Sequence, residues 1–146
     1  MKIKFKKTHP STVSPAYANE QAAGLDISTR EEVTVQPLTP TLIPTGIAVE
    51  IPEGYVGILA LRSSTPIKKG LFIPNGVGII DSDYRGELFM QVAALKEAVT
   101  IPAFDRIAQL IIMPARHVAG MHIIGVEEVE ELSSTERGEG GFGSTG

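Results

Sequence analysis

Glycine and proline punctuate this chain from end to end and limit it to short regular elements. The 146 residues include 15 glycines and 10 prolines, spread through the sequence. The segments between these breaks are rich in Val, Ile, Leu and Thr, and each is bounded by Gly, Pro or Asp, which is typical of β-strands. We expect strands at residues 2–6, 41–51, 55–61, 88–95, 99–101 and 106–113.

Many short strands with regular turn signals favour an all-β fold. The architectures that accommodate them are closed or double-sheet antiparallel structures, such as a barrel or a jelly-roll-like sandwich. The best helical candidate is the acidic segment 126–132. It is too short to be stable alone and is equally compatible with strand and loop.

Composition and charge exclude several classes of protein. The length suits one domain with a single core, and the absence of cysteine excludes disulfides and thiolate metal sites, as in a reducing cytoplasm. A net charge of -4 argues against nucleic acid as the main partner. No apolar run approaches the ~18 residues of a membrane span, and we expect neither a membrane partner nor a signal peptide.

The last 14 residues differ from the rest of the chain. Residues 133–146 contain five glycines and no aliphatic side chain, so they cannot support a packed strand. We therefore divide the chain into a β core at residues 1–132 and a glycine-rich arm at residues 133–146.

The arm is a candidate anion-binding loop, although it is not a P-loop. No helix follows its glycines and the P-loop lysine is missing, so the dinucleotide and P-loop interpretations fail. Arg137, Ser144, Thr145 and free backbone N–H groups can still bind anions, and Phe142 can stack on a base. The alternative is a solvated tail without a ligand.

Two internal segments carry candidate catalytic and phosphate-binding groups. Arg62-Ser63-Ser64-Thr65-Pro66 leaves an apolar strand, and its guanidinium and hydroxyls suit phosphate oxygens, although the same residues form ordinary turns. Residues 75–86 predict a hairpin with Asp81 and Asp83 near one end. A carboxylate at the edge of an apolar hairpin is a candidate general base, and turn chemistry is the equal alternative.

A lone acid and a polar pair complete the candidates. Asp26 lies inside an apolar strand, so it requires either an arginine partner or a metal ion. Arg106 and Gln109 are three residues apart, which on a strand places them on opposite faces, one toward a ligand and one supporting the fold. The three histidines share no metal-ligand spacing and no Ser-His-Asp grouping is present.

Five segments, taken in order, resemble the five motifs of the trimeric dUTP diphosphatase (dUTPase) family. Each motif is weak alone, but five in order are specific, and the match runs from residue 22 to residue 146. The matching segments are Ala23-Gly24-Leu25-Asp26, Arg62-Ser63-Ser64, Gly78-Ile79-Ile80-Asp81-Ser82-Asp83-Tyr84-Arg85-Gly86, Asp105-Arg106-Ile107-Ala108-Gln109 and Arg137-Gly138-Glu139-Gly140-Gly141-Phe142-Gly143-Ser144.

The resemblance implies a jelly-roll-like homotrimer that hydrolyses dUTP to dUMP and pyrophosphate, with Mg2+ held on the triphosphate. In this family one subunit supplies motifs one, two and four, a second supplies motif three, and a third lends the arm. The implied function keeps uracil out of DNA and supplies dUMP for thymidylate synthesis, in the cytoplasm or, for a viral protein, in the host cytoplasm or nucleus.

The resemblance also implies a role for each site residue. Asp81 would orient the attacking water, and Asp26 would reach the metal through water or support a neighbouring arginine. The implied substrate-binding residues are Arg62, Ser63, Ser64, Asn75, Gly78, Ile79, Ile80, Tyr84, Gln109, Arg137, Phe142, Gly143, Ser144 and Thr145.

These residues divide by the part of the substrate they would contact. The segment from Asn75 to Tyr84 would bind uracil and deoxyribose and exclude a thymine methyl and a 2′-hydroxyl. Arg62, Ser63, Ser64 and Gln109 would bind phosphates, while the arm would cover the uracil through Phe142 and bind the γ-phosphate.

The sequence departs from the family pattern at two places and leaves three alternatives open. Ser64 stands where glycine is common, and Ile101-Pro102-Ala103-Phe104 replaces a glycine turn before motif four. The alternatives are a dCTP deaminase of the same fold, which would not need the arm as a phosphate lid, a non-catalytic nucleotide-binding regulator, and a structural trimer of the capsid jelly-roll type.

Overall fold

The computed structural model describes residues 2–115, 117–118, 122–123 and 127–136. Among these residues, the elements are almost all strands, as expected from the sequence. They are β1 (Lys4–Lys7), β2 (Ala16–Tyr17), β3 (Leu25–Ile27), β4 (Val33–Val35), β5 (Thr41–Glu50), β6 (Tyr55–Leu61), α1 (Ser64–Lys69), β7 (Leu71–Phe72), β8 (Gly78–Ile80), β9 (Glu87–Ala94), β10 (Val99–Ile101), β11 (Ala108–Pro114), β12 (His117–Val118) and β13 (His122–Ile123).

The predicted strands are confirmed within a residue or two at their ends, and the helical candidate is wrong. Residues 127–132 form neither helix nor strand, so the described part of that segment is a loop. The helix that forms within the described residues, α1, lies in the segment around Thr65 and Pro66, for which an ordinary turn was the alternative to a phosphate-binding segment. Within the described residues, no helix is long and apolar enough to cross a membrane.

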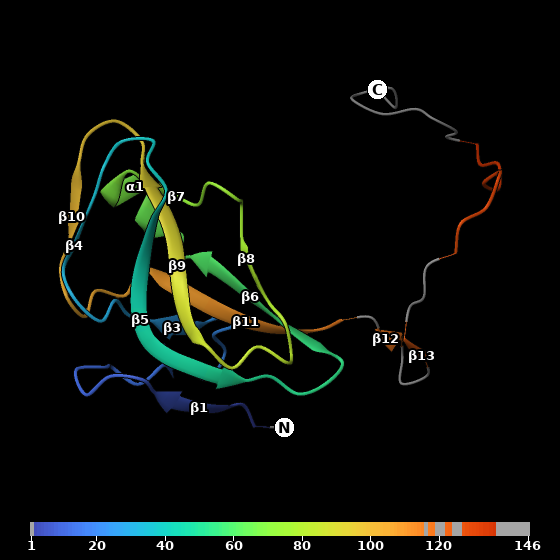
Figure 1. The fold of residues 1–146 in the computed structure, drawn as a ribbon, viewed down its shortest axis with the longest axis horizontal. Helices are drawn as coiled ribbons and strands as arrows, with labels where there is room; N and C mark the ends of the chain where they lie inside the picture. The colour runs from blue at the N-terminus through green and yellow to red at the C-terminus, as the bar shows by residue number, and fades with distance from the viewer. Residues whose placement is uncertain (1, 116, 119–121, 124–126, 137–146) are drawn as a thin grey trace.

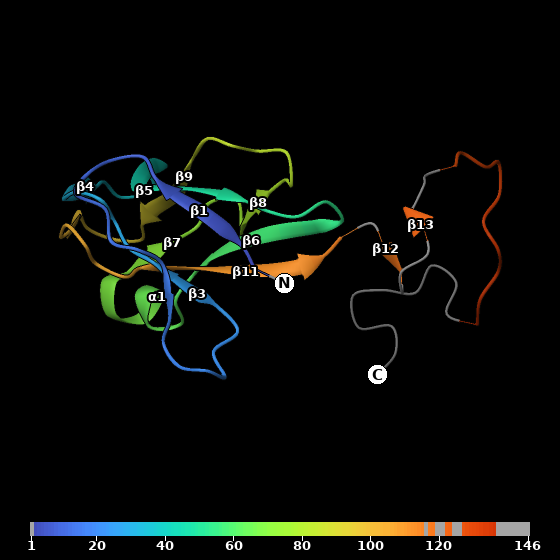
Figure 2. The same cartoon turned by 90° about the horizontal axis from the view of Figure 1, so that it is seen from below.

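Two antiparallel sheets face each other and confirm the jelly-roll-like architecture. In the described part of the chain, one sheet has the order β1-β5-β9-β7 and the other the order β2-β3-β11-β6-β8, while β10 and β4 form a separate pair. Figure 2 shows the β1, β5 and β9 layer above the β3, β6 and β11 layer. Residues that are far apart in sequence therefore share one core.

Branched aliphatic side chains fill the space between the sheets. β5 and β9 contribute more buried residues than any other strand whose burial is described. They pair from Thr41 opposite Val92 to Ala48 opposite Glu87, with an irregularity between Pro44 and Ala48. Burial of each such side chain contributes about 1.5–3 kcal/mol. Fully buried core residues are Ile27, Val35, Ile43, Ile47, Leu59, Leu71, Leu88, Met90, Val92, Ile101, Ile107 and Leu110.

The predicted hairpin at residues 75–86 is wrong in its pairing. β8 pairs with β6, with Gly78 opposite Leu59 and Ile80 opposite Gly57, whereas β9 belongs to the other sheet. The chain turns after Ile80 and passes from one sheet to the other before β9 begins. The two apolar stretches do form strands, but these strands pair with different partners, which the sequence pattern alone does not distinguish.

A buried threonine fixes the loop between β10 and β11. Thr29 is 1% exposed. Its hydroxyl donates to the carbonyl of Pro102 at 2.8 Å and accepts from the N–H of Asp105 at 3.1 Å. Its backbone N–H donates to Asp105 O at 2.9 Å, and its carbonyl accepts from Phe104 N at 3.0 Å. These bonds hold Phe104 at a φ of 66°, a conformation that non-glycine residues seldom adopt.

Replacing Thr29 by Val should therefore destabilise the fold. The change keeps the shape but removes the hydroxyl that bonds both groups, which leaves the Asp105 N–H and the Pro102 carbonyl with only their mutual contact at 3.4 Å. The cost should be about 1–3 kcal/mol. The matched control is Thr34→Val, since Thr34 is exposed on β4 and faces the Thr100 hydroxyl at 3.0 Å. The control should stay within about 0.5 kcal/mol of wild type. Urea unfolding measures both, and equal losses would contradict the special role of Thr29.

Candidate active site

A buried carboxylate organises two arginines at the end of β6. Asp26, on β3, is 8% exposed. Its Oδ1 lies 3.1 Å from Nε of Arg62, and its Oδ2 lies 3.4 Å from a terminal nitrogen of Arg106. A buried charge needs such partners. The cluster carries two positive charges and one negative, and because both arginines are more exposed than Asp26, its outer surface is positive.

Gln109 joins the same cluster. On β11 it lies opposite Asp26 of β3 and Ala60 of β6, and its Nε2 donates to the carbonyl of Leu61 at 3.1 Å. A side chain at Gly24 would collide with the Gln109 amide, so any other residue there would displace that amide. The Asp26 carboxylate thus supports arginines, which was one of the two alternatives for it.

The predicted separation of Arg106 and Gln109 onto opposite faces is wrong. Both side chains lie beside Asp26, through the Arg106 contact at 3.4 Å and the register of Gln109. The reason is that β11 begins at Ala108, so Arg106 lies in the preceding loop and does not follow strand alternation.

Ser63 and Ser64 are exposed at the start of α1, beside Arg62. The loop before β11 holds this helix at three points. The N–H of Arg62 and the hydroxyl of Thr65 both donate to the Ile107 carbonyl, at 2.9 and 3.0 Å. The ammonium of Lys69 lies 2.6 Å from the Asp105 carboxylate. The second and fourth motifs are therefore one structural unit.

The segment around Asp81 presents a different surface. Ile79 is 58% exposed on β8 and Tyr84 is 43% exposed after it, while Asn75 and Asp81 are also exposed. Gly78 and Ile80 are half-buried and pair with β6. A surface pocket of about 710 Å³ is lined by residues of the turn and of the start of β6, namely Ile51, Glu53, Gly54, Tyr55, Val56, Asp81, Ser82, Asp83, Arg85 and Ala115.

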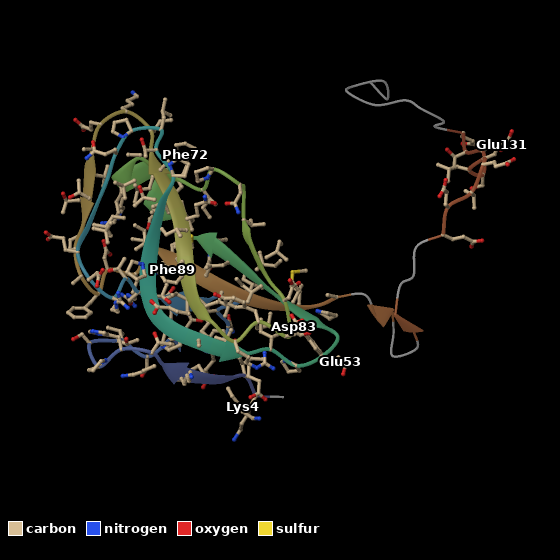
Figure 3. The ribbon with its side chains drawn as sticks, in the orientation of Figure 1. Lys4, Glu53, Phe72, Asp83, Phe89 and Glu131 are labelled. Carbon is tan, nitrogen blue, oxygen red and sulfur yellow. The ribbon has the colours of Figure 1, made fainter. Side chains whose placement is uncertain are left out.

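Within one chain, these two surfaces are far apart. Since Ile80 lies opposite Gly57, Asp81 is level with Val56, whereas Arg62 is six residues further along the same strand direction. At ~3.3 Å per residue, the separation is roughly 20 Å. Figure 3 shows Asp83 and Glu53 at the end of the sheet where β6 begins, and Figure 1 shows α1 at the opposite end. The single chain does not bring Asp81 to the arginine cluster.

The predicted residues of the arm and the predicted metal contact of Asp26 remain to be placed. Arg137, Phe142, Gly143, Ser144 and Thr145 all lie outside the part of the chain that the structure describes. Within that part, no group of three or more His, Cys, Asp or Glu side chains could hold a metal ion. Both oxygens of Asp26 contact arginines, so it is not a ready-made direct ligand.

Sequence reasoning missed two residues that shape the site, Thr29 and Lys69. A signal for α1 did exist, because Pro66 fits the first turn of a helix and Gly70 follows Lys68 and Lys69. Gly70 has a φ of 63°, and its N–H donates to the Pro66 carbonyl at 3.0 Å. The contacts of Thr29 span 73 residues of sequence and had no local signal.

The chain is similar to dUTPases in sequence and in structure. The dUTPase family profile matches residues 11–146. The deoxyuridine 5'-triphosphate nucleotidohydrolase of Nautilia profundicola is 46% identical over 147 residues, covering 100% of this chain and 99% of that protein. The dUTPase of Staphylococcus bacteriophage 80alpha, in a structure with dUpNHpp, matches with a TM-score of 0.86 and 30% identity over 99% of this chain and 98% of that one.

A second viral protein also matches. The dUTPase of phage phi11 of S. aureus has a TM-score of 0.77 and 26% identity, over 90% of this chain and 98% of that chain. Its structure describes the coordination of a structural Mg(II) ion in that protein.

The Lys69–Asp105 pair should couple measurably in the folded state. The side chains are 33% and 25% exposed, so water screens the pair only in part. A double-mutant cycle with Lys69→Met and Asp105→Asn should give a coupling free energy of about 1 kcal/mol, read from urea unfolding at neutral pH. A coupling indistinguishable from zero would show that the ion pair does not hold α1.

The control pair is Lys4 and Glu50, which are 2.7 Å apart and far more exposed. The hydrogen bond from Lys4 and its charge lower the pKa of the Glu50 carboxyl. Any stabilisation from this pair is therefore present above the carboxyl's unfolded pKa and is lost as the pH falls through the lowered one. At neutral pH its coupling should be the smaller of the two, because solvent screens both groups.

Proposed function

The chain belongs to the dUTPase family, as its motifs predicted, and we propose that it hydrolyses dUTP to dUMP and pyrophosphate at a site shared between subunits. The observation that carries the proposal is the positive cluster of Arg62 and Arg106 over the buried Asp26. We place the reaction in the cytoplasm, where it would keep uracil out of DNA and supply dUMP for thymidylate synthesis.

The phosphate end of the substrate would lie on the arginine cluster. A guanidinium held by a carboxylate on one side keeps its other N–H groups oriented for phosphate oxygens. Arg62, Ser63, Ser64 and Gln109 would bind the phosphates, with Ser64 contributing a hydroxyl where glycine is common. The bonds from α1 to Ile107 support this arrangement by holding both motifs in one unit.

The base end would lie along β8. This strand is at the edge of its sheet, with β6 on one side and no strand on the other among the described residues. Its outer N–H and C=O groups can therefore pair with uracil, while Asn75 adds an amide and Tyr84 packs against the deoxyribose. Close backbone approach would exclude the thymine methyl sterically, because a roomy apolar pocket discriminates one methyl group by only ~1–3 kcal/mol.

Asp81 would act as the general base. An exposed carboxylate directly after β8 can hold a water in line with the α-phosphorus. The water oxygen bonds to that phosphorus, the bond to the bridging oxygen of the leaving pyrophosphate breaks, and the proton passes to Asp81. Magnesium would arrive bound to the triphosphate, since the described residues offer no cluster of three metal ligands. Asp26 would contact that ion through water, beyond its arginines.

A homotrimer would join the two surfaces. The separation of roughly 20 Å along β6 supports a site in which Asp81 of one subunit faces Arg62 of another. The composition of residues 133–146 cannot support an independent fold, and this arm would close over the site from a third subunit. Phe142 and Gly143 would cover the uracil. The γ-phosphate would be bound by Arg137, Ser144 and Thr145.

The competing functions predict different products. A dCTP deaminase releases ammonia, and a non-catalytic regulator binds dUTP without turnover. We expect pyrophosphate release from dUTP, with dTTP, UTP and dCTP turned over at least ~100-fold more slowly. Removal of Mg2+ with a chelator should lower turnover of dUTP. Ammonia release from dCTP, or dUTP binding with no pyrophosphate in the presence of Mg2+, would refute the proposal.

Replacing Asp81 by Asn should separate binding from chemistry. The amide keeps the shape but cannot take the proton, so turnover of dUTP should fall by about 10²–10⁴-fold while dUTP binding is retained. Steady-state pyrophosphate release and calorimetric titration with a non-hydrolysable dUTP analogue measure the two effects. Wild-type turnover by this variant would show that Asp81 is not the general base.

Deletion of residues 137–146 should leave a folded oligomer with severely reduced turnover. The core lies in the strands before residue 115, so thermal unfolding and sedimentation should match the full chain. Unfolding or dissociation of the truncated protein would show that the arm is structural instead.

A further inference from the structure

The turn that carries Asp81 lies between the two sheets. β8 ends at Ile80 and β9 begins at Glu87, so residues 81–86 lie outside the strand ladders. The N–H of Tyr84 donates to the Asp81 carbonyl at 3.2 Å, which closes a turn. This bond is long for an N–H···O contact, and it fixes the backbone at the Asp81 carbonyl only.

Both ends of the turn are firmly attached. On one side, Ile80 pairs with Gly57 of β6. On the other side, the Glu87 carboxylate accepts from the N–H of Gly46 and the hydroxyl of Thr8, both at 2.8 Å. The Tyr84 hydroxyl donates to the Glu87 carbonyl at 2.8 Å. None of these bonds restrains the backbone between Asp81 and Tyr84.

Arg85 supplies that support from inside the turn. One terminal guanidinium nitrogen donates to two backbone carbonyls, that of Ser82 at 2.6 Å and that of Tyr84 at 2.9 Å. These carbonyls belong to the residue after Asp81 and to the residue that closes the turn. A charged, planar donor bridging two carbonyls restrains their relative orientation, and a charge-assisted bond is roughly twice as strong as a neutral one.

We propose that Arg85 is a positioning residue, which bridges the Ser82 and Tyr84 carbonyls and thereby fixes the direction of the Asp81 carboxylate. The inference rests on the proposed function of Asp81. Arg85 and Asp81 line the same pocket of about 710 Å³, but the arginine nitrogen described above is engaged with the backbone. Its effect should therefore fall on the chemical step, because a base misplaced by about 1 Å can cost 10²-fold in rate.

Arg85→Ala tests the proposal, with Lys6→Ala as the matched control. Arg85 and Lys6 line one groove with Lys4 and Glu50, so both changes remove a positive charge from the same place. Lys6 donates to neither turn carbonyl. We expect Arg85→Ala to lower kcat for dUTP by about 10–100-fold with a smaller change in KM, and Lys6→Ala to keep both constants near wild type.

Chemical rescue distinguishes positioning from a loss of charge or of folding. Guanidinium at millimolar concentration should restore part of the kcat of Arg85→Ala by occupying the space between the two carbonyls. Tetramethylammonium at the same ionic strength carries the charge but no N–H donor and should not. Arg85→Lys should recover activity in part, since a single ammonium can donate to both carbonyls as the one arginine nitrogen does. Thermal unfolding of Arg85→Ala should match wild type, because its side chain is on the surface.

Several results would overturn the proposal. A wild-type kcat in Arg85→Ala, a loss confined to KM, an equal loss in Lys6→Ala, or unfolding of Arg85→Ala at the assay temperature would each do so. Asp81→Asn is assayed in parallel to separate this inference from the function it rests on. Full turnover by Asp81→Asn would show that Asp81 is not the base and would reject the proposed function. An inactive Asp81→Asn beside a fully active Arg85→Ala would reject only the role of Arg85.

Discussion

The buried carboxylate of Asp26 connects three segments that are distant in sequence. It lies on β3, receives Arg62 from the end of β6, and receives Arg106 from the loop before β11. A buried charge is costly without such partners, so the carboxylate constrains where both guanidinium groups can lie. Gln109 on β11 lies opposite Asp26, and helix α1 follows directly after Arg62. The proposed phosphate-binding surface depends on this one interaction.

The two halves of the proposed site lie at opposite ends of one strand, β6. The arginine cluster lies where β6 ends, and Asp81 lies level with its beginning, so the length of β6 divides the two halves of the proposed site. A reaction at one phosphorus atom needs both halves within a few ångströms. The same geometry that makes one chain incomplete therefore explains why a symmetric assembly would complete it.

Sequence predicted the strands well and the contacts between them poorly. β5 and β9 were evident because long apolar segments bounded by Gly and Pro have few other solutions. The pairing of β8 was missed, because an apolar segment before a turn looks the same whether its partner is the next strand or β6. Asp26 was recognised as needing a partner, and its arginines were identified by structure. Thr29 had no signal in local pattern, since the carbonyl it bonds lies 73 residues away in sequence. Arg85 was noted only as part of the third motif, although the carbonyls it bonds are one and three residues away.

The central claim is that Asp81 and Arg62 act together only across a subunit boundary, and subunit complementation tests it most directly. Asp81→Asn and Arg62→Gln chains, each folded and each inactive alone, would be mixed in denaturant, refolded together and assayed for pyrophosphate release from dUTP. If the site is shared, random assembly should restore about a quarter of the wild-type sites, because each such site pairs an intact Arg62 with an intact Asp81 from different chains. Activity no greater than that of the two variants alone would contradict the shared site.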